Sequence, residues 1–148
     1  MAVGFWVAIA VMLVAGAAVA LQAPINGRMA AFAGGTLPAS IISFALGLAL
    51  LSALALVRGE WPTLAGLAQA PWWAWTGGAL GAWFVWGTAF SVDALGLVTL
   101  VAVVILGQVL AGVVIDSVGA FGLPVRDISW SRALSVLLVL GGVLLSRV

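Results

Sequence analysis

The residues whose types and spacing could bind a solute lie in Leu21–Arg28, directly after about 20 almost wholly apolar residues. Gln22 and Asn26 are four positions apart, so on a continued helix their amides share one face. Pro24 lacks a backbone N–H, which frees a carbonyl one turn earlier and can kink the helix. Two interpretations follow. The stretch is a helix end at which Arg28 reaches the headgroups, or a polar lining beside a membrane pathway.

Composition places the rest of the chain in a lipid bilayer. Of 148 residues, 66% are hydrophobic and 6% are charged, which predicts an integral membrane protein. At about 20 residues per crossing, five helices nearly use up the chain and leave no room for a soluble domain. We expect one all-α membrane domain over residues 1–148, with a retained first span rather than a signal peptide. The expected spans are about 4–23, 38–57, 71–91, 94–115 and 128–146.

Several residue types that carry chemistry are missing. The chain has no Cys, no His and no Tyr, which removes thiol chemistry, the usual metal ligand and the commonest proton shuttle. No nucleophile–base pair or metal-ligand cluster stands out. We therefore expect no enzyme activity, no metal, no cofactor and no nucleic-acid partner.

The 71–91 span predicts a helix with two contrasting faces. At 100° per residue, Gly77 and Gly81 fall on a small-residue face that lets another helix approach closely. Trp75, Trp83 and Trp86 fall on an aromatic face. These tryptophans are either bulk packed against lipid or protein, or the walls of a cavity for an apolar or cationic solute. The residues that fall in this sector of the helix are Trp72, Trp75, Ala79, Trp83, Trp86 and Phe90.

Isolated polar side chains interrupt two other spans. Gln108 lies in the 94–115 span between Gly107 and Gly112, which are further candidates for close helix packing. Its amide makes either an interhelical hydrogen bond or a contact with a solute. Ser40 and Ser43 lie in the first turns of the 38–57 span, where their hydroxyls can bond back to their own helix or across to a neighbour.

The charged residues all fall at or near span ends. A charge at the bilayer centre is costly and usually functional, and none is expected there. Asp93 and Asp116 come nearest to such a place. They are end-cap or headgroup-level charges, or sites that couple transport to an ion.

The arginines give little preference for one orientation. With five spans, Arg58, Arg126 and Arg132 fall on one side of the membrane, and Arg28 and Arg147 on the other. Because an excess of Lys and Arg fixes orientation, three against two is close to no bias. We therefore expect the chain to insert in both orientations or to take its orientation from a partner. Two antiparallel chains would form the inverted repeat that many transporters carry within one chain.

Two blocks of residues resemble the YdcZ-type family of small bacterial inner-membrane proteins, within the drug/metabolite transporter superfamily. The first block is Gln22-Ala23-Pro24-Ile25-Asn26-Gly27-Arg28 followed by Ser43-Phe44 and Gly47. The second is Leu106-Gly107-Gln108, Ile115-Asp116, Gly119, Phe121-Gly122 with Pro124, and Gly141-Gly142-Val143-Leu144-Leu145. The chain departs from the family pattern at Ser117 and Val118, where a His and an aromatic residue are expected, and at Asp93, where no acid is expected.

The resemblance implies a five-helix half-transporter in the bacterial inner membrane, working as an antiparallel dimer with itself or with a homologous chain. It is similar in principle to the small multidrug resistance proteins. Those use a glutamate in their first helix, where this chain offers only Gln22 and Asn26.

Secondary transport of a small polar or weakly cationic solute by alternating access is the leading prediction. In this interpretation Gln22, Asn26 and Gln108 hydrogen-bond the solute and the three deeper tryptophans wall the site. The alternatives are a dual-topology ion channel and a membrane partner of another protein that transports nothing itself.

Overall fold

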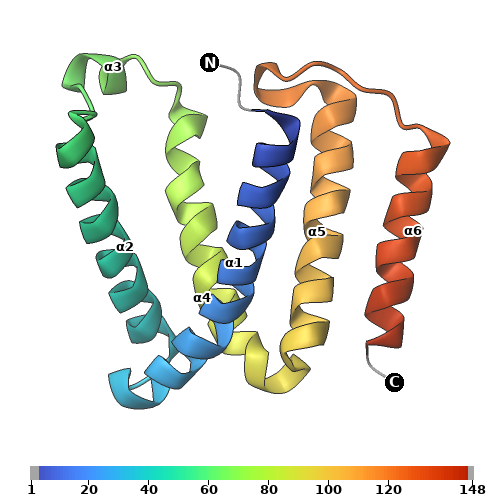
Figure 1. Ribbon diagram of the computed structural model, residues 1–148, viewed down its shortest axis with the longest axis horizontal. Helices are drawn as coiled ribbons and strands as arrows, with labels where there is room; N and C mark the ends of the chain where they lie inside the picture. The colour runs from blue at the N-terminus through green and yellow to red at the C-terminus, as the bar shows by residue number, and fades with distance from the viewer. Residues whose placement is uncertain (1–3, 147–148) are drawn as a thin grey trace. The chain divides into compact units, whose positions relative to one another are not determined.

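The computed structural model describes residues 4–146, and within that range the regular elements are all helical (Figure 1). The expected all-α class is therefore confirmed for this part of the chain. Arg147, one of the arginines in the orientation argument, lies outside the described residues. The elements are α1 (Phe5–Ala33), α2 (Thr36–Arg58), α3 (Leu64–Ala68), the 3₁₀ helix η1 (Trp72–Trp75), α4 (Thr76–Leu95), α5 (Leu97–Val118), the 3₁₀ helix η2 (Ala120–Gly122) and α6 (Trp130–Leu145).

Three described helices are long and apolar enough to cross a bilayer: α1, α2 and α5. Helix α6 is apolar but shorter, with 16 residues. Helix α4 has 20 residues, which is the length of a crossing, but is not among the three. A multi-pass helical membrane protein is confirmed, and the count of five crossings stays a prediction.

The chain divides into two compact units, one ending at Asp93 and the other beginning at Ala94. In the N-terminal unit, α1 and α2 form an antiparallel pair joined by the Gly34–Gly35 turn. Helix α4 approaches α1 where Gly27 lies beside Val92 and approaches α2 where Gly81 lies beside Phe44. Both glycines have positive φ, 83° and 143°, a region that residues with a Cβ rarely adopt. The buried residues are Ala23 and Asn26 of α1, Ala39 and Ser40 of α2, and Val85, Thr88, Ala89 and Val92 of α4.

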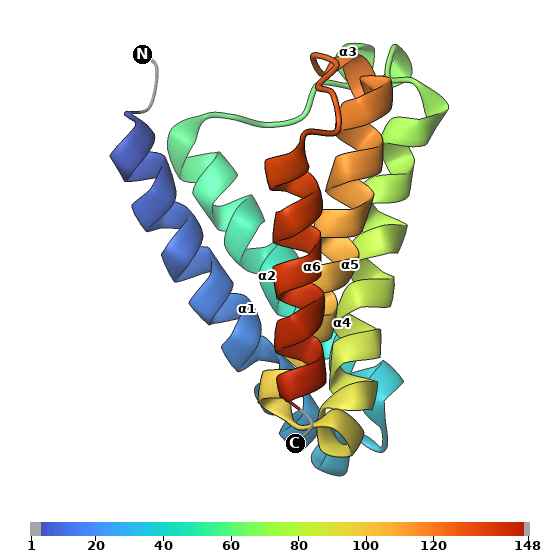
Figure 2. The same cartoon turned by 90° about the vertical axis from the view of Figure 1, so that its right-hand side faces the viewer.

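In the C-terminal unit, α5 and α6 lie side by side and antiparallel (Figures 1 and 2). The Thr99 hydroxyl at the start of α5 donates to the Ser146 carbonyl oxygen at 3.1 Å, just after α6 ends. At the other end, Arg132 Nη2 donates to Asp116 Oδ2 at 3.0 Å, and the Arg126 N–H donates to the Asp116 carbonyl oxygen at 2.8 Å. Polar contacts therefore link the α5–α6 pair at both of its ends.

The structure corrects three details of the sequence prediction. Helix α1 continues through Pro24 to Ala33, so the interpretation of Leu21–Arg28 as a helix end is wrong. Trp75 lies in the 3₁₀ turn before α4, so the aromatic face does not run along one α-helix from residue 72. Asp93, which falls between the expected spans 71–91 and 94–115, lies inside α4, and the turn follows at Gly96 with φ of 73°.

Candidate functional site

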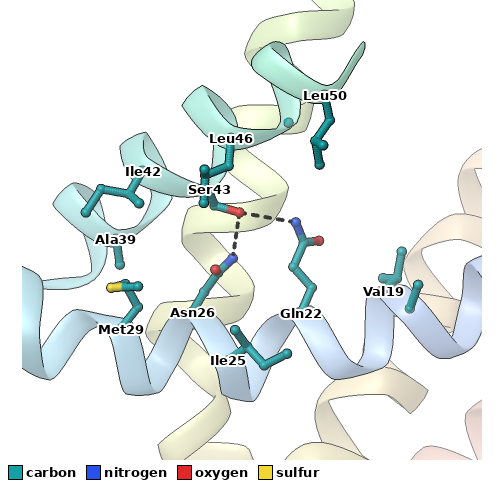
Figure 3. Close-up of a pocket in the computed structure, with 12 residues that line it drawn as sticks. Val19, Gln22, Ile25, Asn26, Met29, Ala39, Ile42, Ser43, Leu46 and Leu50 are labelled. Atoms are coloured by element: carbon teal, nitrogen blue, oxygen red, sulfur yellow. Dashed lines mark hydrogen bonds between the residues drawn. The ribbon is translucent and has the colours of Figure 1, made fainter. Parts of the chain in front are cut away.

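The two amides of α1 meet one hydroxyl of α2. Gln22 Nε2 donates to Ser43 Oγ at 3.5 Å, and Asn26 Nδ2 donates to the same oxygen at 3.4 Å (Figure 3). The helical spacing of four places both amides on the face of α1 that looks toward α2. Both distances are long for N–H···O hydrogen bonds, so each contact taken singly is weak.

A groove of about 470 Å³ runs along this polar cluster between α1 and α2. Gln22, Asn26 and Ser43 are the polar residues among the twelve that line it, and the lining holds no charged side chain. The others are Ala18, Val19, Ile25, Met29, Ala39, Ile42, Leu46, Gly47 and Leu50. An apolar groove with a few convergent polar groups is the usual form of a small-molecule site.

A second hollow, of about 300 Å³, shares part of this lining. Gln22, Ser43 and Gly47 border both hollows, and α4 contributes Val85 to the second. The polar cluster is therefore bordered by open volume on more than one side.

Small residues hold α1 close to its neighbours at the level of the site. Ala23 and Ala39 are 1% and 0% exposed, and Asn26 between the two helices is 5% exposed. A Cβ on Gly27 would lie 3.1 Å from Val92 Cγ1 of α4. Burying an amide without partners is costly, and the contact with Ser43 reduces that cost.

The predicted tryptophans do not gather around the amide groove. Trp75 and Trp83 are 60% and 70% exposed. Trp86 lines a separate hollow of about 250 Å³, together with Ser40 and Phe44 of α2. Along α4, Trp83 contacts Trp86 and Trp86 stacks on Phe90, with ring centroids 5.2 and 5.4 Å apart. The aromatic face therefore exists on α4, and its role in binding a solute stays a prediction.

Gln108 and the two candidate coupling acids have different surroundings. Gln108 is exposed on α5, in the C-terminal unit. Asp93 is exposed near the end of α4. Asp116 is held in the ion pair with Arg132, with side chains 33% and 25% exposed respectively. Arg132 Nη1 is buried and has no hydrogen-bond partner among residues 4–146.

The predicted packing glycines have mixed surroundings. A Cβ on Gly81 would lie 3.6 Å from the Phe44 ring, so this glycine is in contact distance of α2. Gly77, Gly107 and Gly112 have nothing within 4 Å of that position in the described chain. Close packing at these three positions stays a prediction.

Comparison with known proteins identifies the family. Residues 7–145 match the family described as "Putative inner membrane exporter, YdcZ". The chain belongs to this family. The resemblance inferred from the two sequence blocks is thereby confirmed, and so is a multi-pass location in the bacterial inner membrane.

A YdcZ-family relative from Escherichia coli (strain K12), "Inner membrane protein YdcZ", is 30% identical over 76 residues. The match spans 51% of each chain, so this chain covers about half the length of that relative. No solved structure matches the chain.

Sequence reasoning did not select two residues of this candidate site, Ser43 and Gly27. Both residues belong to the first block that resembles the family, but the sequence analysis assigned neither of them a role in binding a solute. Of the two options for the α2 hydroxyls, Ser40 bonds back to the Thr36 carbonyl oxygen at 2.9 Å, while Ser43 bonds across to α1. No local signal separated Ser43 from Ser40, because both hydroxyls lie in the first turns of the same span.

Proposed function

We propose that the chain is a secondary transporter that exports a small polar or weakly cationic solute by alternating access. The observation that supports this most is the cluster of Gln22, Asn26 and Ser43 in an uncharged, mostly apolar groove. Amides and a hydroxyl can hydrogen-bond a solute without a full counter-charge, and the apolar walls suit its hydrocarbon part. Membership in an inner-membrane exporter family favours transport over enzyme chemistry.

The transporting unit in this proposal is an antiparallel dimer of five-span chains, of itself or with a homologue. The near-even distribution of arginines supports it, because no strong signal fixes one orientation. The open faces at Gly77, Gly107 and Gly112 also support it, because a second copy could approach closely there. The two copies together would supply the inverted repeat of an alternating-access transporter.

Uptake into proteoliposomes tests the transport function. Choline, benzylguanidinium and ethidium serve as labelled probes of increasing apolar area under an imposed gradient. We expect at least one probe to enter with saturation, and we expect Gln22→Ala to lower that uptake about tenfold, which corresponds to one lost hydrogen bond to a charged group. Gln69→Ala is the matched control because Gln69 is an exposed amide after α3.

Three results would contradict the proposal in different ways. Saturable uptake that Gln22→Ala leaves unchanged would remove Gln22 from the site. Flux far beyond thousands of ions per second would indicate the channel alternative. Absence of flux for all three probes, together with co-purification of an unrelated membrane protein, would indicate a partner protein that transports nothing.

A further inference from the structure

Ser43 occupies a special place in the polar cluster because two amides share its single oxygen. A hydroxyl carries one hydrogen, so two amides that converge on it cannot both turn their oxygens toward it. At least one must present N–H, and in the structure both do. In the structure Ser43 therefore accepts from the N–H end of both amides.

The consequence is that both amide oxygens are left for the groove. Figure 3 shows the oxygens of Gln22 and Asn26 on the sides of the amides away from Ser43. Within residues 4–146, neither oxygen accepts a hydrogen bond from the protein. The other nine residues of the lining carry no side-chain hydrogen-bond donor.

We propose that Ser43 determines the specificity of this groove: it directs the amide oxygens of Gln22 and Asn26 into the groove and so selects solutes that carry N–H or O–H donors on an apolar body. This inference rests on the proposed transport site and narrows its substrate class. A donor-bearing cation or a neutral donor satisfies the two oxygens. A carboxylate meets two acceptors and no cation, so anions are excluded.

Three probes with the same apolar ring separate donor recognition from charge and size. Benzylguanidinium is a permanent cation with N–H donors, benzyltrimethylammonium is a cation without donors, and benzoate is an anion. Binding of each is measured by calorimetry on the purified protein in lipid nanodiscs. We expect the wild-type protein to bind benzylguanidinium about tenfold more tightly than benzyltrimethylammonium, which corresponds to one charge-assisted hydrogen bond, and to bind benzoate least.

Substitutions at Ser43 test whether the hydroxyl sets this preference. In Ser43→Ala the amides lose their common acceptor and can turn N–H groups into the groove, so the preference should fall to about twofold and benzoate binding should strengthen. Ser43→Thr keeps the hydroxyl and should keep the preference. Ser40→Ala is the matched control, because Ser40 lies one turn earlier on α2 and bonds its own helix.

The outcomes for Ser43 and for transport are separable. Equal preference in wild type and in a folded Ser43→Ala variant, or loss of preference in Ser43→Thr, would overturn the role of Ser43. No binding of benzylguanidinium to the wild-type protein would overturn donor selection. Donor-selective binding that Ser43→Ala abolishes, without gradient-driven uptake in proteoliposomes, would support the role of Ser43 and refute the transport function.

Discussion

Gly27 provides the sharpest test of how the site is positioned. It follows Asn26 on α1 and lies against α4, where an added Cβ would be 3.1 Å from Val92 Cγ1 and 3.9 Å from the Ala89 carbonyl oxygen. Val92 is 8% exposed, and its β-branched side chain has few alternative rotamers in a helix. A methyl group on residue 27 must therefore push α1 away from α4 or strain Val92.

Two opposing effects set the size of the change in Gly27→Ala. Overpacking a tight contact costs about 1–3 kcal/mol. Replacing Gly by Ala in a helix interior stabilises the helix by about 1 kcal/mol. The net expectation is a decrease of roughly 0–2 kcal/mol in the free energy of unfolding. Gly16→Ala, at a position of α1 with nothing within 4 Å, should show only the stabilising effect.

Reversible unfolding in mixed micelles, followed by tryptophan fluorescence, measures both variants. Val92→Ala completes the test. It removes the Cγ1 methyl group, which is the atom that a Cβ on residue 27 would touch. In that background Gly27→Ala should become stabilising, with a coupling energy between the two sites of about 1 kcal/mol or more. Equal effects of Gly27→Ala and Gly16→Ala would refute the close approach of α1 to α4.

Three further predictions concern the Asp116–Arg132 ion pair, the Gln108 amide and the orientation of the chain in the membrane. Asp116→Asn should lower the free energy of unfolding by about 1–2 kcal/mol, because it breaks a partly buried pair with Arg132; Asp127→Asn, at an exposed acid, should change it little. Gln108→Ala should lower saturable uptake in proteoliposomes if the second chain of the dimer brings this amide to the pathway, and unchanged uptake would remove Gln108 from the site. A cysteine added after Val148 should react with an impermeant thiol reagent in about half of the molecules. All-or-none labelling would exclude an antiparallel homodimer.

The candidate site was predictable from sequence only in part. The spacing of Gln22 and Asn26 predicts a shared helix face, and the structure places both on the face toward α2. The partner was not predictable, because Ser40 and Ser43 are equally placed to bond forward or back until the helices are packed. The spacing of the tryptophans predicted one aromatic face, but a 3₁₀ turn at Trp72–Trp75 changes the rotation per residue before α4 begins.

The amino-acid sequence by itself determined the class of this protein and its family. A chain with 66% hydrophobic and 6% charged residues has no stable place except a bilayer, and there the backbone must satisfy its hydrogen bonds within helices. Tertiary structure alone decided that helix α1 continues through Pro24, that Gln22 and Asn26 share Ser43, and that Gly27 lies against Val92. The contacts of Ser43 and Gly27 depend on distances between helices. Small-residue packing sets such distances, and no local pattern of residue types encodes them.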